Sequence, residues 1–397
     1  MADVRSRRDV LSQLGTLVAA VTASKWVSPR AFAQRAPGQA APLFAYVGCF
    51  TTEEREAIGE GINVYRVDPV SGNWSHVQLV GDLESPSFLA IDRESRFLYS
   101  VHADEPYTSA FAIDPATGRL TYLNSQDNGG TNGVHLAIDP SNRFVVVSNY
   151  ASGSMAVLPI NQDGSLAPRS DLVDLPGAPG PHPTQQTSSH PHHNPFDPQG
   201  RFLLVPDKGL DRVFVFGLDT ASGTLVSANP PSVVAQPGAG PRHADFHPTL
   251  PYAYVLNELD STLAVFAYDT QSGELKRQQL LSTLPDDFAG DNTTAEIAVH
   301  GSGRFLYCSN RGHDSIATFT IDQSTGSVSL LGWTPTGGER PRYFGLDPSG
   351  TFLYACNERS HTIVAFHVDA ATGELSPTGH VVETGSPVTI VFGQPSV

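Results

Sequence analysis

The chain has 397 residues, of which 40% are apolar and 16% are charged, with 36 glycines and 31 prolines. This composition is typical of a globular protein rich in turns, and the length would allow two or three domains. The net charge of −16 argues against nucleic acid or an anionic membrane as a partner, because either partner needs a basic face.

Residues 1–33 have the features of a twin-arginine signal peptide. Residues 6–11 (SRRDVL) match the export motif, a modestly apolar run follows, and residues 31–33 (AFA) form a cleavage site. The alternative is a basic disordered tail. The apolar run is short and contains Lys25, so it is a poor membrane span. The sequence therefore predicts an exported protein, periplasmic or secreted, with a linker over residues 34–42 and no membrane span in the mature chain.

Beyond this leader, short apolar runs alternate with turns marked by Asp-Pro, Ser-Gly and Thr-Gly pairs, and no segment keeps a helical period. One pattern, an apolar strand, a turn and a second strand of the type Arg-Phe-Leu-Tyr, recurs along the chain. It occurs at residues 88–100, 135–149, 196–207, 246–257, 297–310 and 346–357. Each copy continues into a third strand and, through a glycine turn, a fourth. Four antiparallel strands in roughly fifty residues are typical of a β-propeller blade.

The two ends of the repeat region complement each other. Residues 43–80 begin with the second-strand motif and lack a first strand, whereas residues 387–392 (PVTIVF) form a first strand with nothing after it. Pairing them completes a seventh blade and removes two exposed sheet edges. The sequence therefore predicts an all-β protein over residues 43–397, a single seven-bladed β-propeller closed by pairing the C-terminal strand with the N-terminal blade.

In an antiparallel blade, the first strand begins and the second strand ends on the same face of the disc. Polar residues at these positions should therefore meet around one mouth of the central channel, as in many small-molecule sites. They are His102, His135, Asn149, Tyr150, His190, His192, His193, Asp207, Lys208, Arg242, His243, Asn257, Glu258, Glu296, Asn310, Arg311, Arg340, Arg342, Asn357 and Glu358.

Position in the repeat separates structural from functional candidates. Four of the asparagines share one repeat position, which favours a structural role in the turn after the second strand. Glu258 breaks the repeat. It is either a general acid or base in a semi-enclosed mouth, or the partner of Arg242 or Arg311 in an ion pair that closes the ring.

His190 and His192 would point the same way on a strand. With His182 nearby they could hold zinc, or the segment could be a surface loop; we favour a catalytic or substrate-binding role without a metal. The sequence contains no nucleophile elbow, Walker loop or Cys-His motif, and no cofactor is expected. The three cysteines lie in apolar strands of separate repeats and are predicted to be buried free thiols: Cys49, Cys308 and Cys356.

Several motifs together carry a family resemblance. They are the pair His190-x-His192 before residues 196–202 (FDPQGRF), then residues 205–212, 240–243 (GPRH), 257–262 (NELDST) and 309–316 (SNRGHDSI). These motifs resemble the lactonase family of seven-bladed propellers, which includes bacterial 6-phosphogluconolactonase and the fungal carboxy-muconate lactonizing enzyme. The resemblance covers essentially residues 43–392.

The resemblance implies a catalytic site on one propeller face, formed by His192, Arg242, Glu258 and Arg311. The arginines would hold a carboxylate or phosphate and an oxyanion, and Glu258 or His192 would activate water against a lactone carbonyl. The expected substrate contacts are His190, His243, Asn257, Asn310 and Glu358. The resemblance thus implies a lactone hydrolase of carbohydrate metabolism acting on a small lactone or carboxylate.

The export signal modifies this expectation. Sugar phosphates are cytoplasmic, so an exported enzyme would act on a lactone without phosphate, or the fold would serve another purpose. Two alternatives stay open. One is a muconate-type cycloisomerase using the same residues, and the other is a non-catalytic exported propeller that binds a partner.

Overall fold

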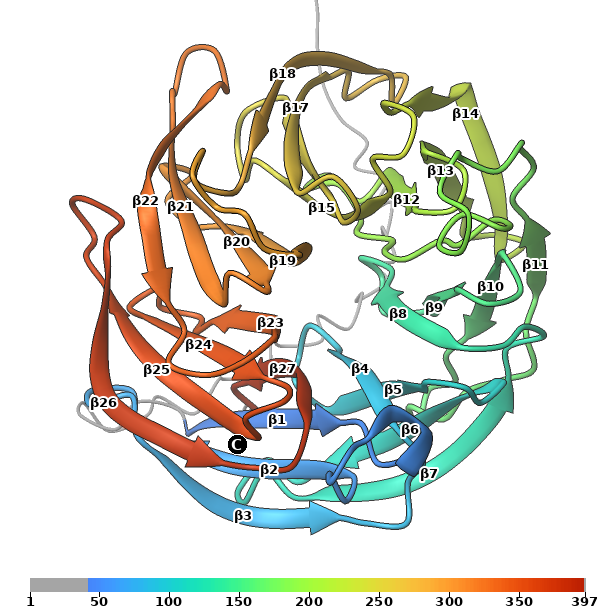
Figure 1. Ribbon diagram of the computed structural model, residues 1–397. Coiled ribbons are helices and arrows are strands. Elements are labelled where there is room, and N and C mark those ends of the chain that lie inside the picture. The colour runs from blue at the N-terminus through green and yellow to red at the C-terminus, as the bar shows by residue number, and fades with distance from the viewer. Residues whose placement is uncertain (1–41, 396–397) are drawn as a thin grey trace, which may run out of the picture. The chain divides into compact units, whose positions relative to one another are not determined.

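Seven small antiparallel sheets stand around a central channel, in a computed structural model that describes residues 42–395 (Figure 1). Blade 1 contains β27 (Pro387–Gly393), β1 (Leu43–Cys49), β2 (Ile62–Val67) and β3 (Trp74–Val80), and a 3-10 turn (Glu53–Arg55) follows β1. Blade 2 contains β4 (Pro86–Ile91), β5 (Phe97–His102), β6 (Tyr107–Ile113) and β7 (Leu120–Asp127). Blade 3 contains β8 (Gly133–Ile138), β9 (Phe144–Asn149), β10 (Ser154–Pro159) and β11 (Asp171–Asp174).

The second half of the ring follows the same order. Blade 4 contains β12 (Phe202–Asp207), β13 (Arg212–Asp219) and β14 (Thr224–Val234). Blade 5 contains β15 (Pro241–Phe246), β16 (Tyr252–Asn257), β17 (Thr262–Tyr268) and β18 (Leu275–Ser282). Blade 6 contains β19 (Thr293–Val299), β20 (Phe305–Arg311), β21 (Ser315–Ile321) and β22 (Val328–Pro335). Blade 7 contains β23 (Pro341–Leu346), β24 (Phe352–Asn357), β25 (Thr362–Val368) and β26 (Leu375–Glu383).

The ring closes through blade 1, as the sequence predicts. β27 pairs antiparallel with β1, from Phe44 opposite Gly393 to Cys49 opposite Pro387, and β1 pairs with β2 on its other side. The all-β seven-bladed architecture and its closure are therefore confirmed. The predicted signal peptide lies outside the described residues.

Blade 4 departs from the predicted pattern of four strands. Its innermost position is held by residues 190–196, which touch β12 only through isolated bridges, Pro191 to Asp207 and Phe196 to Leu203. Pro191 and Pro195 have no N–H to donate, so they cannot extend a regular ladder. The irregular segment places three successive residues, His192, His193 and Asn194, in the buried interior.

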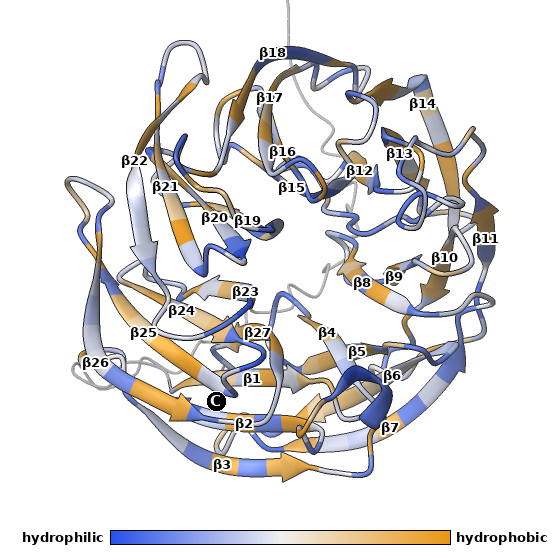
Figure 2. Cartoon of the chain, in the orientation of Figure 1, coloured by the Kyte–Doolittle hydropathy of each residue, from blue (hydrophilic) through white to orange (hydrophobic). Residues whose placement is uncertain are grey.

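The core lies between neighbouring blades, where alternate side chains of each strand pack against the next sheet. Figure 2 shows apolar residues along inner and middle strands such as β21 and β25 and hydrophilic residues on the outermost strand β18. Cys49, Cys308 and Cys356 are buried and free, which confirms their prediction. Within residues 42–395, no helix has the length and apolar character needed to cross a membrane.

On the face opposite the mouth, buried tyrosines connect the blades. At five of the seven blade interfaces, a tyrosine on the second strand donates its hydroxyl to a glycine carbonyl in the outer turn of the next blade. The pairs are Tyr46–Gly118, Tyr99–Gly164, Tyr254–Gly326, Tyr307–Gly373 and Tyr354–Gly72, at 2.9–3.1 Å. Glycine is required at these turns. At Gly326, for example, φ is +68° and an added Cβ would lie 2.2 Å from the Tyr252 ring.

Candidate active site

A cavity of about 190 Å³ opens at the predicted mouth of the channel. Blades 4, 5 and 6 line it with ionisable side chains: His192, Lys208, Arg242, His243, Glu258 and Glu296. The other blades contribute two more cations, Arg55 and Arg342, and an apolar wall formed chiefly by Phe50, Phe88, Ala103, Val134, Tyr343 and Val388. The predicted convergence of first-strand starts and second-strand ends is thus what builds this cavity.

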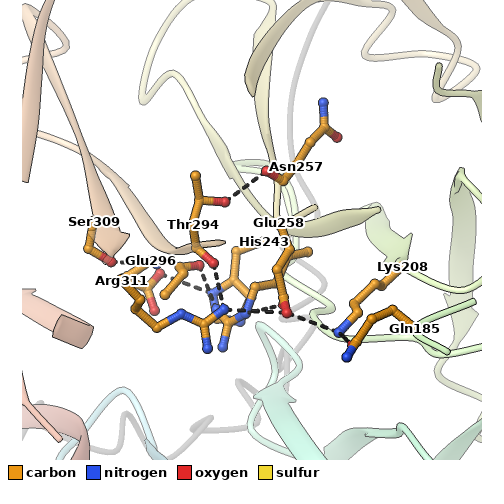
Figure 3. Close-up of polar contacts among 11 residues, drawn as sticks. Gln185, Lys208, His243, Asn257, Glu258, Thr294, Glu296, Ser309 and Arg311 are labelled. Atoms are coloured by element: carbon orange, nitrogen blue, oxygen red, sulfur yellow. Dashed lines mark hydrogen bonds and ion pairs between the residues drawn. The ribbon is translucent and has the colours of Figure 1, made fainter. Parts of the chain in front are cut away.

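Glu258 is the centre of the charged half. Its carboxylate oxygens lie 2.9 Å from Lys208 Nζ, 3.1 Å from Arg242 Nε and 3.4 Å from Arg311 Nη2. Figure 3 shows Lys208 and Arg311 approaching the carboxylate from opposite sides. Three cations therefore share one carboxylate, and the cluster carries excess positive charge. The sequence predicted an ion pair of Glu258 with Arg242 or Arg311, and the structure shows Glu258 paired with both.

The backbone of blades 5 and 6 fixes this cluster. Glu258 directly follows β16, and its N–H donates to the Gly240 carbonyl at 2.7 Å. Arg311 ends β20, and its Nη2 donates to the Thr294 carbonyl at 2.7 Å. Arg242 Nη1 donates to the Ala295 carbonyl in β19. Each arginine is thus held by a carbonyl as well as by Glu258, which leaves it little freedom to move.

Burial and charge set the protonation states of the cluster. Burial raises the pKa of Glu258, but the neighbouring Lys208, Arg311 and Arg242 outweigh it and hold the pKa well below its usual range. Burial, with Arg311 and Arg342 nearby, lowers the pKa of Arg242 to about 9. At neutral pH Glu258 is a carboxylate and Arg242 is a cation.

Four histidines fill the channel beside this cluster. The ring centroids of His193 and His243 lie 4.2 Å apart and nearly parallel, those of His135 and His193 lie 3.9 Å apart, and those of His192 and His243 lie 5.2 Å apart. Burial lowers the pKa of each of them, and Arg242 lowers it further. The stack is therefore neutral at physiological pH, and within residues 42–395 His192 Nδ1 has no hydrogen-bond partner.

Glu296 on β19 supports the histidine stack. Its Oε1 lies 3.1 Å from His243 Nδ1 and accepts the Ile297 N–H at 3.0 Å. Burial raises the pKa of Glu296 to about 8, although Arg242 opposes this shift. The Glu296 carboxyl is therefore largely protonated at neutral pH, unlike that of Glu258 in the same cavity.

The other predicted site residues lie behind or beside the cavity. His190 stacks on Tyr150, with ring centroids 4.4 Å apart, and its Nδ1 bonds the Tyr150 carbonyl at 2.9 Å. Asn257 Nδ2 donates to Thr262 Oγ1 at 2.8 Å and Asn310 Nδ2 to the Thr283 carbonyl at 3.0 Å. These bonds agree with the structural interpretation of the repeated asparagines. Glu358 lies beside Arg359, with 4.0 Å between Oε1 and Nε.

The histidines that could have held zinc are not accompanied by further metal ligands in the described residues. In the described part of the chain, no three His, Cys, Asp or Glu side chains are placed as metal ligands. The His190 and His192 rings both lie against Tyr150, with ring centroids 4.4 and 5.5 Å away, and the His192 ring also lies 5.2 Å from that of His243.

Sequence reasoning missed the apolar wall. Phe50 follows β1, Phe88 belongs to β4 and Val388 to β27, and all three occupy positions that are polar in the charged blades. The sequence did contain a signal for this wall. Phe50, Phe88 and Val388 stand at repeat positions that face the channel, where no neighbouring blade covers an apolar side chain. Arg55 was also missed, because it lies on the short turn after β1 rather than in the repeat.

Comparisons with known proteins agree with this geometry. The family described as lactonase, 7-bladed beta-propeller, matches residues 44–392. The 6-phosphogluconolactonase of Bacillus subtilis is 35% identical over 306 residues, covering 76% of this chain and 84% of the relative. That of Formosa agariphila is 34% identical over 313 residues, covering 76% and 86%.

One solved structure is similar to this chain in both fold and sequence. The periplasmic gluconolactonase of Pseudomonas aeruginosa has a TM-score of 0.82 and 30% identity, covering 89% of this chain and 99% of that one. The matched family spans every blade, from the first residues of β1 to the last strand, β27. The chain therefore belongs to the lactonase family of seven-bladed β-propellers.

Proposed function

We propose that the protein is a lactone hydrolase and that the cavity at the channel mouth is its active site. The observation that carries this proposal is the cationic cluster around Glu258, which lies beside the neutral His192 in a semi-enclosed cavity. Fixed cations stabilise the oxyanion that forms when water attacks an acyl carbon. The relatives named 6-phosphogluconolactonase and gluconolactonase support the same chemistry.

His192 is the better placed base of the two candidates. The Glu258 carboxylate is already shared by three cations, which makes it a weak base, whereas the His192 imidazole is neutral, lines the cavity and forms no ion pair among the described residues. In the proposed reaction, His192 takes a proton from water as the water oxygen bonds to the carbonyl carbon. The ring C–O bond then breaks, and His192 returns the proton to the departing ring oxygen. Glu258 holds Lys208, Arg242 and Arg311 in place.

A pH-stat assay tests the proposal directly. The purified protein would be assayed against gluconolactone, 6-phosphogluconolactone and simple γ-lactones, beside His192→Gln and Glu258→Gln variants. We expect turnover of at least one lactone, lost in His192→Gln. No turnover of any lactone by a folded protein would contradict the hydrolase proposal. Conversion of a linear dicarboxylate instead would favour the cycloisomerase alternative.

We also propose that the protein acts outside the cytoplasm. The support is the motif at residues 6–11, together with the periplasmic gluconolactonase of Pseudomonas aeruginosa as a structural neighbour. Cell fractionation of the wild type and of an Arg7→Lys/Arg8→Lys variant tests this. Export of the wild type and cytoplasmic retention of the variant are expected, and equal distribution of the two would refute a twin-arginine signal.

A further inference from the structure

A layer of five side-chain rings crosses the channel next to the cavity. Phe88 on β4 has its ring centroid 4.3 Å from that of His135, 5.9 Å from that of Tyr343 and 6.4 Å from that of His243. His193 completes this ring layer, 3.9 Å from His135 and 4.2 Å from His243. Each of the five follows directly after a residue that lines the cavity, namely Ser87, Val134, His192, Arg242 or Arg342. Because the first strands begin at the mouth, the ring layer lies deeper in the channel than these residues and forms the floor of the cavity.

The ring layer is only one side chain deep. From the ring onward, four of the first strands pair regularly with their second strands, so the residue two positions further along faces the same side as the ring. These residues are small or short: Ala90, Ala137, Asp245 and Gly345. The residues in between are each 1% exposed and belong to the core: Leu89, Leu136, Ala244 and Phe344. Ala90 and Ala137 are partly exposed although they lie on innermost strands, which indicates that the channel is open behind the ring layer.

The three histidines of the layer are held by polar contacts, and Phe88 is held by packing alone. His243 contacts Glu296, His135 contacts Asn194, and His193 accepts the Ala244 N–H at 3.3 Å. Burial lowers the pKa of all three histidines, so they pack as uncharged rings. The Phe88 side chain has no polar atom, and its replacement would open the layer without breaking a hydrogen bond. Phe88 is thus the member through which the floor can be tested.

The cavity above this floor is small. Its volume of about 190 Å³ lies below the roughly 300–1,000 Å³ of pockets that hold drug-sized ligands. A chain directed at the floor would have to displace packed rings, and forcing extra carbon atoms into packed side chains is costly. A chain directed at the mouth would reach solvent instead. The direction of a substituent should therefore decide whether the cavity accepts it.

From this arrangement we propose that Phe88 determines substrate specificity by limiting the depth of the cavity. The substrate is then a lactone of a single ring, and it carries no long chain on the carbon that faces the floor. This inference rests on the lactone hydrolase proposed above. Phe88 is a specificity-determining residue in this scheme and takes no part in the proton transfers.

The charged side of the cavity makes this selection depend on position. If the lactone carbonyl faces Lys208, Arg242 and Arg311, the orientation of the ring is fixed. The carbon next to the carbonyl (α) and the carbon next to the ring oxygen (γ) lie on opposite sides of the ester group. When one of them faces the floor, the other faces the mouth. A chain should therefore be rejected at one of these two carbons and accepted at the other.

The test compares γ-butyrolactone with its α-hexyl and γ-hexyl derivatives. We expect the wild type to discriminate between the two hexyl isomers by about tenfold or more in kcat/KM. Phe88→Ala should raise kcat/KM for the disfavoured isomer about tenfold or more relative to γ-butyrolactone, because the chain can then enter the channel beyond Ala90 and be buried there. Phe88→Val should give a smaller gain of the same sign, and it serves if Phe88→Ala does not fold.

Two variants control for effects other than depth. Phe288→Ala removes the same ring from the loop before β19, where Phe288 packs on His313 outside the cavity, and it should keep the wild-type pattern. Phe88→Ala/Ala90→Leu refills the channel behind the layer and should lose the gain. A wild type that hydrolyses both hexyl isomers as well as γ-butyrolactone would overturn the inference. The absence of a gain in both Phe88 variants, or an equal gain in Phe288→Ala, would do the same.

A binding measurement separates this inference from the proposed function. Cyclopentanone and its 2-hexyl and 3-hexyl derivatives have the same ring size and cannot be hydrolysed, so their affinities measured by calorimetry do not depend on catalysis. We expect Phe88→Ala to bind one hexyl ketone about tenfold more tightly than the wild type and Phe288→Ala do. This result without turnover of any lactone would contradict the hydrolase and leave the floor standing. Equal affinities of the wild type and Phe88→Ala for both hexyl ketones would overturn the floor, whatever the activity.

Discussion

The two faces of the propeller are built on opposite principles. On the mouth face, charged groups are buried against each other, and atoms at the ends of second strands, such as Asn257 Oδ1 on β16 and Arg311 Nε on β20, have no hydrogen-bond partner within residues 42–395. On the opposite face, the same second strands carry tyrosines whose hydroxyls are paired with glycine carbonyls in the next blade. The strands β16 and β20 thus each carry a buried hydrogen-bonded hydroxyl near one end and a buried atom without a hydrogen-bond partner at the other.

This difference indicates where stability and function lie. Buried unpaired polar groups are costly, so a fold tolerates them only where they serve a purpose. Buried hydrogen bonds that recur from blade to blade are what a ring of sheets needs to stay closed. Substitutions on the mouth face should therefore change activity more than stability, and those on the opposite face should do the reverse.

The largest effect is expected from removing a cation at the mouth. Arg242→Ala should lower kcat/KM for a lactone about a hundredfold or more, because it removes one charge that faces the oxyanion. Thermal unfolding followed by circular dichroism should change little, since Glu258 keeps Lys208 and Arg311 as counter-ions when Arg242 is removed and is not left as an unpaired buried charge. Arg277→Ala, an exposed substitution on β18, is the control. A loss of activity matched by a loss of folded protein would contradict the division between the faces.

The next effect concerns pH. Arg242, with a pKa of about 9, loses its charge as the pH rises, so kcat/KM should fall about fivefold between pH 9 and pH 10. Between pH 6.5 and 8 the low pKa of His192 predicts no acid-side loss of the base. Burial raises the pKa of Tyr307, so the opposite face stays protonated throughout. A flat alkaline profile in a full pH–rate measurement would remove Arg242 from the reaction.

A smaller effect is expected on the opposite face. Tyr307→Phe removes the donor to the buried Gly373 carbonyl and should lower the free energy of unfolding by about 1–3 kcal/mol. Its kcat/KM should equal that of the wild type. Tyr122→Phe, whose hydroxyl bonds Ser125 at the surface, should change neither value. Denaturant titration gives the energies, and reduced activity in folded Tyr307→Phe would show that the two faces are coupled.

The smallest effect is expected for the cysteines, which lie in the buried strands between the two faces. Burial raises the pKa of Cys49 to about 12 and that of Cys308 and Cys356 well above the usual range, so all three thiols are protonated and inaccessible. The native protein should therefore show almost no reaction with a thiol reagent such as Ellman's reagent. Reaction in denaturant provides the control, and rapid native labelling would contradict the burial of these strands.

The repeat predicted the fold because each blade repeats the same local chemistry. Strand alternation, glycine turns and the unmatched strand over residues 387–392 were enough for the blades and their closure. The three-stranded blade 4 was not predicted, because the motif from Phe196 onward resembles a full copy of the repeat. Pro191 and Pro195 interrupt the innermost strand only because their missing N–H groups would have to pair with β12, and that pairing is visible only in the fold.

The sequence predicted where the candidate site residues lie, but not which of them contact each other. Repeat positions brought Glu258, Arg242 and His192 to one mouth, yet the sequence could not show that a third cation, Lys208, would also bind Glu258. The opposite protonation states of Glu258 and Glu296 depend on how many cations surround each carboxyl. Such counts of contacts are properties of the folded ring rather than of any one blade.

The pairing of β27 with β1 has a consequence for how the protein is made. β1 is the first and β27 the last of the described strands, so the ring cannot close until nearly the whole propeller sequence has been made. Until then, blade 1 has an open edge, and the contact that closes it joins nearly the most distant parts of the propeller sequence, which is slow to form. The cavity, which is lined by residues of blade 1 as well as of blades 4 to 7, is therefore completed only when β27 pairs with β1.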